Sequence, residues 1–252
     1  MFDYSERGAW RPKIFFACYA GIALLAVSLL WQPTAMIWRQ IDEVAYYTLN
    51  GSLDGNPAWT YFWGHLTTSK ANIFIGTIMV LPLLWVLAFN RSQTAVKRFS
   101  TVTLVVLFVS VGVLIAKTCF DGVNRISPSL ELLPFYDMNL LVDGIKAKTG
   151  STKSFPGDHA VTTLIYAVLV IAFMRSRMLT TFAIIVAIIN TLPRLFAGSH
   201  WLSDIVVGSG ALALFIFPFA LATPSLRLTE MIWRQVFSLL NQSVATFFRK
   251  SH

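Results

Sequence analysis

The sequence has few charged residues. Asp, Glu, Lys and Arg make up 13% of its 252 residues, while 56% are hydrophobic, and a soluble domain would carry about 25% charged residues. The mean hydropathy is +0.64. Internal repeats and low-complexity segments are also lacking. This composition excludes an ordinary soluble domain or a repeat protein, and it predicts an integral membrane protein.

Cysteine is scarce as well. The two cysteines, Cys18 and Cys119, lie inside one apolar run and just after another. Their different depths in a membrane argue against a disulfide between them. Two cysteines cannot complete a zinc site without other ligands, so we expect neither a disulfide framework nor a cysteine-based metal site.

Six apolar runs are long enough to cross a bilayer as helices, which takes about 17–25 residues each. They cover residues 14–31, 72–89, 99–116, 159–174, 178–192 and 205–222. The fourth and fifth runs are the shortest. Because the segments between the runs leave no room for a second domain, we predict an all-α integral membrane protein with six transmembrane helices and a single domain spanning residues 1–252.

The basic residues predict the orientation of this helical bundle. If the amino terminus is cytoplasmic and the spans alternate, the cytoplasmic segments hold 12 of the 20 Lys and Arg residues but only 3 of the 12 acidic residues. Since positively charged loops stay in the cytoplasm, both termini are predicted to face it. The net charge of +8 therefore reflects the orientation of the protein in the membrane, and it implies no nucleic-acid partner. The cytoplasmic tail, residues 223–252, is either an interfacial helix or unstructured.

The first outer segment, residues 31–71, is rich in Trp and Tyr, which prefer the headgroup layer. Residues 36–49 predict an amphipathic interfacial helix that ends at Asn50-Gly51. Two interpretations remain open: a surface that admits lipid substrates sideways, or a plain aromatic belt.

The most informative stretch holds a cation, an imidazole and a carboxylate: Arg194, His200 and Asp204. If a helix starts at His200, positions 200 and 204 share one face. Asp204 then accepts a hydrogen bond from one ring nitrogen of His200 and leaves the other free as a nucleophile or base. Arg194 offers planar donors suited to phosphate. The alternative is that these residues only anchor a helix at the membrane edge.

A second motif closes the longest loop, residues 117–158. Pro156-Gly157 predicts a tight turn, and His159 then lies at a helix amino terminus, which favours an anion. A lone histidine there would be a cap. On the predicted topology, however, His159 shares one side of the membrane with Lys117 and Arg125 as well as with the previous motif. Ionisable groups gathered at membrane depth indicate a functional site.

This combination of residue types suits phosphoryl transfer. Arginines and a helix start bind phosphate, His200 attacks phosphorus, and His159 protonates the leaving oxygen. The cations neutralise the charge of the transferred group, so we expect neither a metal nor a cofactor. The product of the first step would be a phosphohistidine.

The third motif resembles that of the type-2 phosphatidic-acid phosphatase superfamily, an arginine motif that ends in His-x-x-x-Asp. Arg194, His200 and Asp204 match it, with Pro193 where the family often has Ser. The family has two further motifs, a lysine–arginine motif and Pro-Ser-Gly-His. The resemblance covers roughly residues 99–222 and implies a membrane-embedded lipid phosphatase fold.

The other two motifs match in part. Pro156 and His159 agree with Pro-Ser-Gly-His, whereas Gly157 and Asp158 replace its serine and glycine. In the first motif, Arg125 is followed by Ile rather than Pro, and Lys117 is one residue further from it than in the family, a distance that a flexible side chain bridges by snorkelling.

The second and third motifs together are similar to the lipid A 1-diphosphate synthases of Gram-negative bacteria. That resemblance implies transfer of the distal phosphate of undecaprenyl diphosphate to the 1-phosphate of lipid A. It also implies an active site on the periplasmic face of the bacterial inner membrane, with membrane lipids as the other partners. The implied catalytic motifs lie within residues 117–204, with three catalytic residues and five phosphate-binding residues: His200, His159 and Asp204; Arg125, Arg194, Lys117, Gly157 and Asp158.

Two other functions stay open at this point. The same chemistry could release phosphate from undecaprenyl diphosphate or a lipid phosphate to water. A non-enzymatic transporter or scaffold would instead place polar groups along a path through the spans, and the inner halves of these spans are almost uncharged. We hypothesise that Gly157 and Asp158 reshape the phosphate cradle and tune His159 for transfer.

Overall fold

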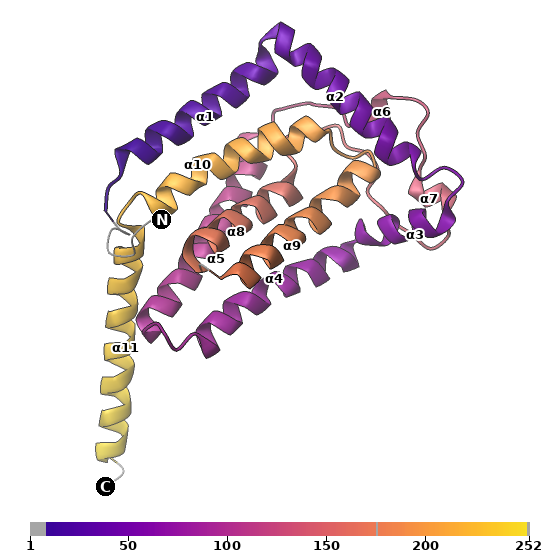
Figure 1. Cartoon of the computed structure of the whole chain (residues 1–252). Helices are drawn as coiled ribbons and strands as arrows, with labels where there is room; N and C mark the ends of the chain where they lie inside the picture. Colours follow the sequence, from indigo (N-terminus) through magenta and orange to yellow (C-terminus); the bar gives the residue numbers. More distant parts are fainter. Residues whose placement is uncertain (1–8, 175, 251–252) are drawn as a thin grey trace.

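The computed structural model describes residues 9–174 and 176–250, and over these ranges the regular structure is helical throughout (Figure 1). In chain order the helices are α1 (Pro12–Leu30), α2 (Gln32–Gly51), α3 (Pro57–Leu66), α4 (Ser69–Phe89), α5 (Ala95–Cys119), α6 (Pro128–Glu131), α7 (Met138–Leu141), α8 (Asp158–Met174), α9 (Arg177–Phe196), the π-helix η2 (Asp204–Ser209), α10 (Gly210–Leu221) and α11 (Ser225–Lys250).

Five helices are long and apolar enough to cross a membrane: α1, α4, α5, α9 and the continuous η2–α10 segment. They coincide with five of the six predicted spans. The remaining one, 159–174, forms α8, which is apolar but has only 17 residues. The protein is therefore an all-helical, multi-pass membrane protein, and the sixth span stays a prediction.

Helix α8 lies at the centre of the hydrophobic core, between α5, α9 and α10. Val161, Ile165 and Leu169 on this helix are 0–1% exposed. A Cβ atom at Gly112 of α5 would lie 2.2 Å from the Ile165 side chain, so the two helices approach closely because that position is glycine. The packing places the amino terminus of α8 at a fixed depth in the bundle.

Helix α9 is longer than the apolar run predicted. It continues through Pro193 to Phe196, whereas the predicted span ended at residue 192. Proline removes a backbone donor inside a helix and normally disfavours it there. Burial of Leu195 and Phe196 against neighbouring elements keeps this last turn helical, and Arg194 consequently lies on the helix.

Helix α2 confirms the helix predicted over residues 36–49, although it begins earlier, at Gln32. Its place in the membrane interface stays a prediction. Its exposed face carries Ile37, Ile41 and Val44. Its buried edge is polar: the Asn50 side chain donates to the backbone oxygens of Tyr136 and Phe196. These hydrogen bonds hold α2 against the end of α9 and the loop around Tyr136.

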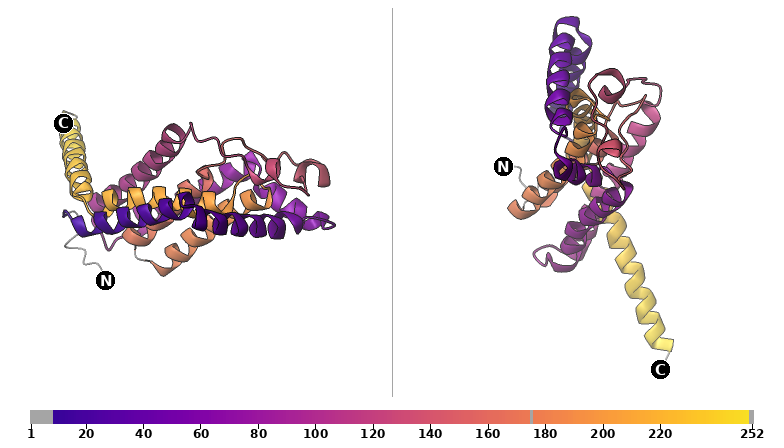
Figure 2. Two further views of the ribbon diagram at one scale, coloured as in Figure 1. Left: turned by 90° about the horizontal axis from the view of Figure 1, so that it is seen from above. Right: turned by 90° about the vertical axis from the view of Figure 1, so that its right-hand side faces the viewer.

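The tail forms a helix. Helix α11 projects away from the other helices in Figures 1 and 2, but its first half packs on α5, where Trp233 donates to Thr103 and its ring contacts that of Phe99 at a tilt. The unstructured alternative for the tail is therefore wrong over Ser225–Lys250. Asp3, Glu6, Arg7 and Arg175, which the charge argument counts, lie outside the described residues.

Both cysteines are free, Cys18 buried and Cys119 exposed, as their separation predicted.

Candidate active site

The residues that the sequence singles out for chemistry gather at one end of the bundle. The ends of α5 and α9 and the beginnings of α8 and η2 meet there, together with the loop that carries α6 and α7 (Figure 1). In this arrangement His159 begins α8, Arg194 is in the last turn of α9, and His200 lies between α9 and η2.

The orientation of His200 is set by a backbone carbonyl. Its Nδ1 atom lies 2.7 Å from the carbonyl oxygen of Ser154. A carbonyl has no hydrogen to give, so Nδ1 is the donor. In the neutral ring, Nε2 then keeps its lone pair. The geometry prepares Nε2 of His200 as a nucleophile or base.

The hydrogen bond predicted between His200 and Asp204 is not formed. The Oδ2 atom of Asp204 lies 3.7 Å from Nδ1 of His200, beyond hydrogen-bond distance. The prediction assumed a helix starting at residue 200, but helical structure starts at residue 202. Asp204 Oδ2 instead accepts the backbone N–H of Trp201 at 2.9 Å. The carboxylate thus supports the turn that carries His200.

Arg194 and His159 meet directly. Nη2 of Arg194 lies 3.0 Å from Nε2 of His159 and 2.6 Å from the side-chain oxygen of Asn72, while Nη1 donates to the Thr67 carbonyl at 2.9 Å. Arginine can only donate, so Nε2 of His159 is the acceptor and carries no hydrogen. Arg194 is 4% exposed, and its position is fixed by α4 as much as by its own helix.

One small pocket joins these groups, and it has no free space for a water-sized molecule in this structure. Its lining comprises Gly157, His159, Ala160, Thr191, Arg194, His200 and Ile205. The Gly157 carbonyl accepts the Ser209 hydroxyl at 3.0 Å, which ties the start of α8 to the π-helix. Four of the eight predicted site residues therefore line one pocket, and a phosphate could enter it only if side chains such as Arg194 moved.

Arg125 lies in a different position from the one expected of a phosphate ligand. Its Nη1 donates to Asp204 at 2.7 Å, and its Nη2 donates to Ser203 at 2.8 Å and to Asp42 at 3.1 Å. Both terminal nitrogens are thus bound by protein oxygens, because the helix α2 carboxylate of Asp42 reaches across to the loop. These contacts tie Arg125 to protein carboxylates, and its assignment as a phosphate ligand stays a prediction.

The Asp42 carboxyl is almost completely buried, at 2% exposure. Burial raises its pKa above the ordinary value for aspartate, and the nearby charge of Asp204 adds to the rise. Hydrogen bonds from Ser203 and the charge of Arg125 act in the opposite direction. Asp42 is therefore easier to protonate than an exposed aspartate.

Lys117 and Asp158 are two further residues that the sequence predicted to bind phosphate. Lys117 is exposed in the last turn of α5 and makes no hydrogen bond or ion pair with the residues that the structure describes. Asp158 accepts the backbone N–H of His159 through Oδ1 at 2.8 Å. As a carboxylate it offers a phosphate no donor, and its assignment to phosphate binding stays a prediction.

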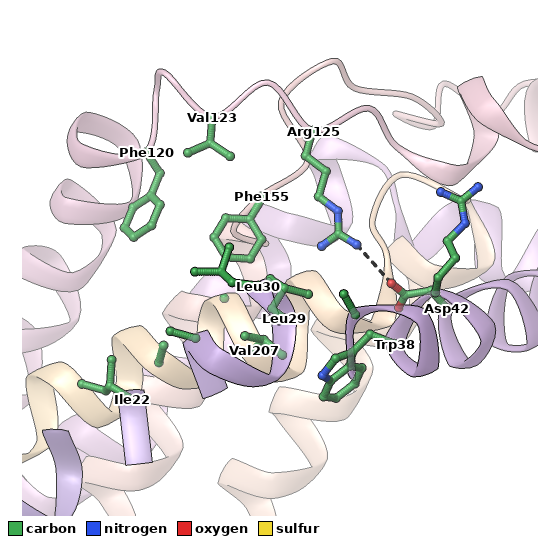
Figure 3. A pocket seen from close by; sticks show the side chains of 15 residues that line it. Ile22, Leu29, Leu30, Trp38, Asp42, Phe120, Val123, Arg125, Phe155 and Val207 are labelled. Atoms are coloured by element: carbon green, nitrogen blue, oxygen red, sulfur yellow. Dashed lines mark hydrogen bonds and ion pairs between the residues drawn. The ribbon is translucent and has the colours of Figure 1, made fainter. Parts of the chain in front are cut away.

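A larger cavity of about 640 Å³ lies on the other side of Arg125, between α1, α2, α10 and the loop after α5 (Figure 3). Its walls are apolar and include Leu29, Leu30, Phe120, Phe155 and Val207. Figure 3 shows the ion pair of Arg125 with Asp42 at its polar edge. Such a space is of the size of ligand pockets in general.

Comparison with known proteins finds a family similarity in the second half of the chain. Residues 104–226 match the model of the PAP2 superfamily. The chain carries a PAP2 domain. It is 28% identical over 246 residues to the lipid A 1-diphosphate synthase of Escherichia coli strain K12, covering 95% of this chain and 93% of that protein.

Two further similarities are more limited. A lipid A 4'-phosphatase of Bacteroides thetaiotaomicron is 32% identical over 87 residues, which cover 34% of this chain and 37% of that protein. A solved structure, the transmembrane PAP2 type phosphatidylglycerolphosphate phosphatase of Bacillus subtilis, is 17% identical with a TM-score of 0.47, covering 81% of this chain and 92% of that one. The matched residues are similar to the PAP2 superfamily, whose members are phosphatases and phosphotransferases that act on lipid phosphates.

Sequence reasoning missed several residues that support the PAP2 site. Asp42 and Asn72 precede the matched residues 104–226, and their contacts with Ser203 and Arg194 span 161 and 122 positions. No local sequence pattern predicts such contacts. For Asp42, the signal in the sequence was a carboxylate on a helix predicted to be interfacial. Ser154 acts through its backbone, which has no side-chain signature.

The described residues contain no group of three or more His, Cys, Asp or Glu side chains placed to hold a metal ion. The cation in direct contact with His159 is Arg194.

Proposed function

We propose that this PAP2 protein transfers the distal phosphate of undecaprenyl diphosphate to the 1-phosphate of lipid A through a phosphohistidine at His200. The observation that carries the proposal is the hydrogen bond from Nδ1 of His200 to the Ser154 carbonyl, which leaves Nε2 with its lone pair beside Arg194 and His159. The similarity to the lipid A 1-diphosphate synthase supplies the two substrates.

In the first step, Nε2 of His200 attacks the distal phosphorus. The bond from nitrogen to phosphorus forms as the bond from phosphorus to the bridging oxygen breaks, and that oxygen leaves with undecaprenyl phosphate. The imidazole ring gains positive charge and keeps the hydrogen on Nδ1, which the Ser154 carbonyl stabilises. The carboxylate of Asp204, 3.7 Å from Nδ1, stabilises the same charge.

Buried donors are in place for the transferred phosphate. Nε of Arg194 and the hydroxyl of Ser154 are buried without a hydrogen-bond partner among the described residues. Leaving a buried donor unpaired costs about 1–3 kcal/mol. A phosphate in the cavity would accept from Arg194, and its charge would draw Arg194 away from Nε2 of His159.

The state of His159 favours a diphosphate donor. Its Nε2 accepts from Arg194 and so has no hydrogen to give a leaving group. A leaving alkoxide needs such a proton, whereas cleavage of a diphosphate releases a phosphate whose second pKa is about 6. A diphosphate can therefore react without His159 acting as an acid, which modifies the role predicted for it.

The second step separates transfer from hydrolysis. An oxygen of the lipid A 1-phosphate attacks the phosphohistidine, the bond from phosphorus to Nε2 breaks, and its electrons return to His200. This anionic acceptor has no proton to lose. The alternative function, hydrolysis of undecaprenyl diphosphate or another lipid phosphate, uses water, whose proton Nε2 of His159 is placed to accept.

The proposal also covers the membrane topology and the cellular location of the enzyme. We infer six spans within one domain of 252 residues, α8 being the short one, with both termini in the cytoplasm of a bacterium and the site at the periplasmic face of the inner membrane. The gathering of the site residues at one end of the helices supports this arrangement, since alternating spans bring those ends to one side of a membrane.

A label-transfer assay tests the function. Purified protein in detergent with EDTA receives undecaprenyl diphosphate labelled on its distal phosphate, with or without lipid A. We expect label on lipid A with the wild type, none with His200→Ala, and wild-type transfer with the control His65→Ala on exposed α3. Label found only as free phosphate would establish the hydrolase instead, and loss of activity with EDTA would contradict a metal-independent reaction.

A further inference from the structure

The carboxylate of Asp42 connects the interfacial helix α2 to the active-site turn. Its Oδ1 accepts the backbone N–H of Ser203 at 2.8 Å, and its Oδ2 accepts the hydroxyl of Ser203 at 2.5 Å and Nη2 of Arg125 at 3.1 Å. At 2% exposure, Asp42 is as enclosed as a core residue. Burying a charge in this way is costly unless it is paired and hydrogen-bonded.

The same contacts continue to His200. Arg125 also donates to Asp204 at 2.7 Å, and Asp204 holds the backbone N–H of Trp201, the residue after His200. Ser203, bound by Asp42, directly precedes Asp204. The turn that carries the nucleophile is therefore fixed at two points by a residue 158 positions earlier in the chain.

Two carboxylates share one guanidinium in this cluster, so one negative charge remains uncompensated. Arg125 alone could neutralise Asp204, but its Nη2 pairs with Asp42 while its Nη1 pairs with Asp204. The surplus negative charge lies beside Nδ1 of His200, 3.7 Å from the Asp204 carboxylate. In a buried site such a charge stabilises a developing cation more than it would in water.

We propose that Asp42 is a positioning residue for phosphoryl transfer: it holds Arg125 and Ser203 so that the turn carrying His200 keeps its orientation and the cluster keeps an excess negative charge beside the imidazole. Asp42 itself touches no reacting atom, and it lies outside the matched PAP2 residues 104–226. This inference rests on the proposed role of His200 as the nucleophile.

The substitution Asp42→Asn removes the charge and keeps an oxygen for the Ser203 N–H. We expect kcat with undecaprenyl diphosphate to fall about 10- to 100-fold, a usual cost of losing a partner that orients a reacting group. KM should stay unchanged or fall, because a less negative site attracts the diphosphate at least as well. Glu43→Gln is the matched control: Glu43 lies on the same helix, is exposed and pairs with Arg39, and its variant should behave as the wild type.

A double-mutant cycle with Arg125→Gln separates this role from a general loss of structure. If Asp42 acts through Arg125, the double variant should lose little more kcat than Arg125→Gln alone, because coupled residues are not additive. Multiplied losses, an unchanged kcat in Asp42→Asn, or a fall in kcat accompanied by a raised KM would overturn the proposal.

The phosphoenzyme formed by each variant is measured in the same experiment. One outcome would reject Asp42 as a positioning residue and retain His200 as the nucleophile. In that outcome, His200→Ala forms no phosphoenzyme, whereas Asp42→Asn forms phosphoenzyme at the wild-type rate. Phosphoenzyme in His200→Ala would reject the proposed function, and the role of Asp42 with it. We expect slow phosphoenzyme formation in Asp42→Asn and none in His200→Ala.

Discussion

The carbonyl oxygen of Ser154 lies 2.7 Å from Nδ1 of His200. A backbone group thus does what a carboxylate does in many catalytic histidine sites, since it fixes the ring and decides which nitrogen keeps the lone pair. Asp204 is left to stabilise charge and to hold the turn.

The first prediction concerns Asp204→Asn. Where a carboxylate sets the tautomer of a catalytic histidine, the change to Asn lowers kcat about 10⁴-fold. Here Ser154 sets the tautomer, so we expect a smaller loss of about 10- to 100-fold, caused by the lost charge. Steady-state rates of label transfer measure it. A loss near 10⁴-fold would mean that Asp204 orients His200 after all.

The second prediction concerns His159→Gln, whose amide oxygen can still accept from Arg194. Transfer to a lipid phosphate needs no base, whereas hydrolysis needs one, and a positioned base contributes about 10²–10⁴-fold. We expect hydrolysis to fall by at least about 10²-fold and transfer to lipid A to fall much less. The two products are counted in one reaction. Equal losses would indicate that His159 serves both steps alike.

The third prediction concerns Gly157→Ser. A Cβ atom at Gly157 would meet its nearest neighbour, the Ser209 hydroxyl oxygen, at 3.5 Å, which is ordinary contact, so the variant should fold. The hydroxyl adds a donor beside the cavity and should shift the product ratio from transfer towards hydrolysis. Gly76→Ser, at a glycine with open space around its Cβ position, is the control. An unchanged ratio would remove Gly157 from the determinants of the acceptor.

The fourth prediction is that kcat depends on pH through the protonation of Asp42. Because its pKa is raised by burial and by Asp204, Asp42 should become protonated at a higher pH than an ordinary aspartate as the pH falls. A neutral Asp42 no longer pairs with Arg125, and kcat should decline through that range. Arg125 and Ser203 oppose the shift and Asp204 promotes it. The kcat–pH profile of Asp42→Asn should lack this decline, and a profile parallel to that of the wild type would contradict the assignment.

The sequence predicted much of the helical framework, and the reason is physical. Spans such as 72–89 and 99–116 must be apolar over the thickness of a bilayer, and α4 and α5 include them with a few extra residues at their ends. The turn of α9 beyond Pro193 was missed because tertiary burial overrides a local breaker. The length of α8 was foreseen, and its central place in the core was not.

The candidate site was predicted in composition better than in contacts. The meeting of His159, Arg194 and His200 follows from their places at helix ends. The partners of Arg125 could not be inferred, since Asp42 binds it across 83 positions through the fold. The tautomer of His200 depends on a main-chain oxygen, and every residue has one. The spacing of residues in the sequence identifies the reacting side chains, whereas tertiary packing brings together the groups that orient them.

The most direct test of the central claim is to trap the phosphoenzyme. Wild-type protein is mixed with undecaprenyl diphosphate labelled on its distal phosphate, quenched under alkaline conditions that preserve phosphohistidine, and mapped by mass spectrometry, with a parallel sample chased with lipid A before quenching. The account predicts label on His200 that moves to lipid A during the chase. Label on another residue, or transfer to lipid A with no labelled enzyme at any time, would contradict it.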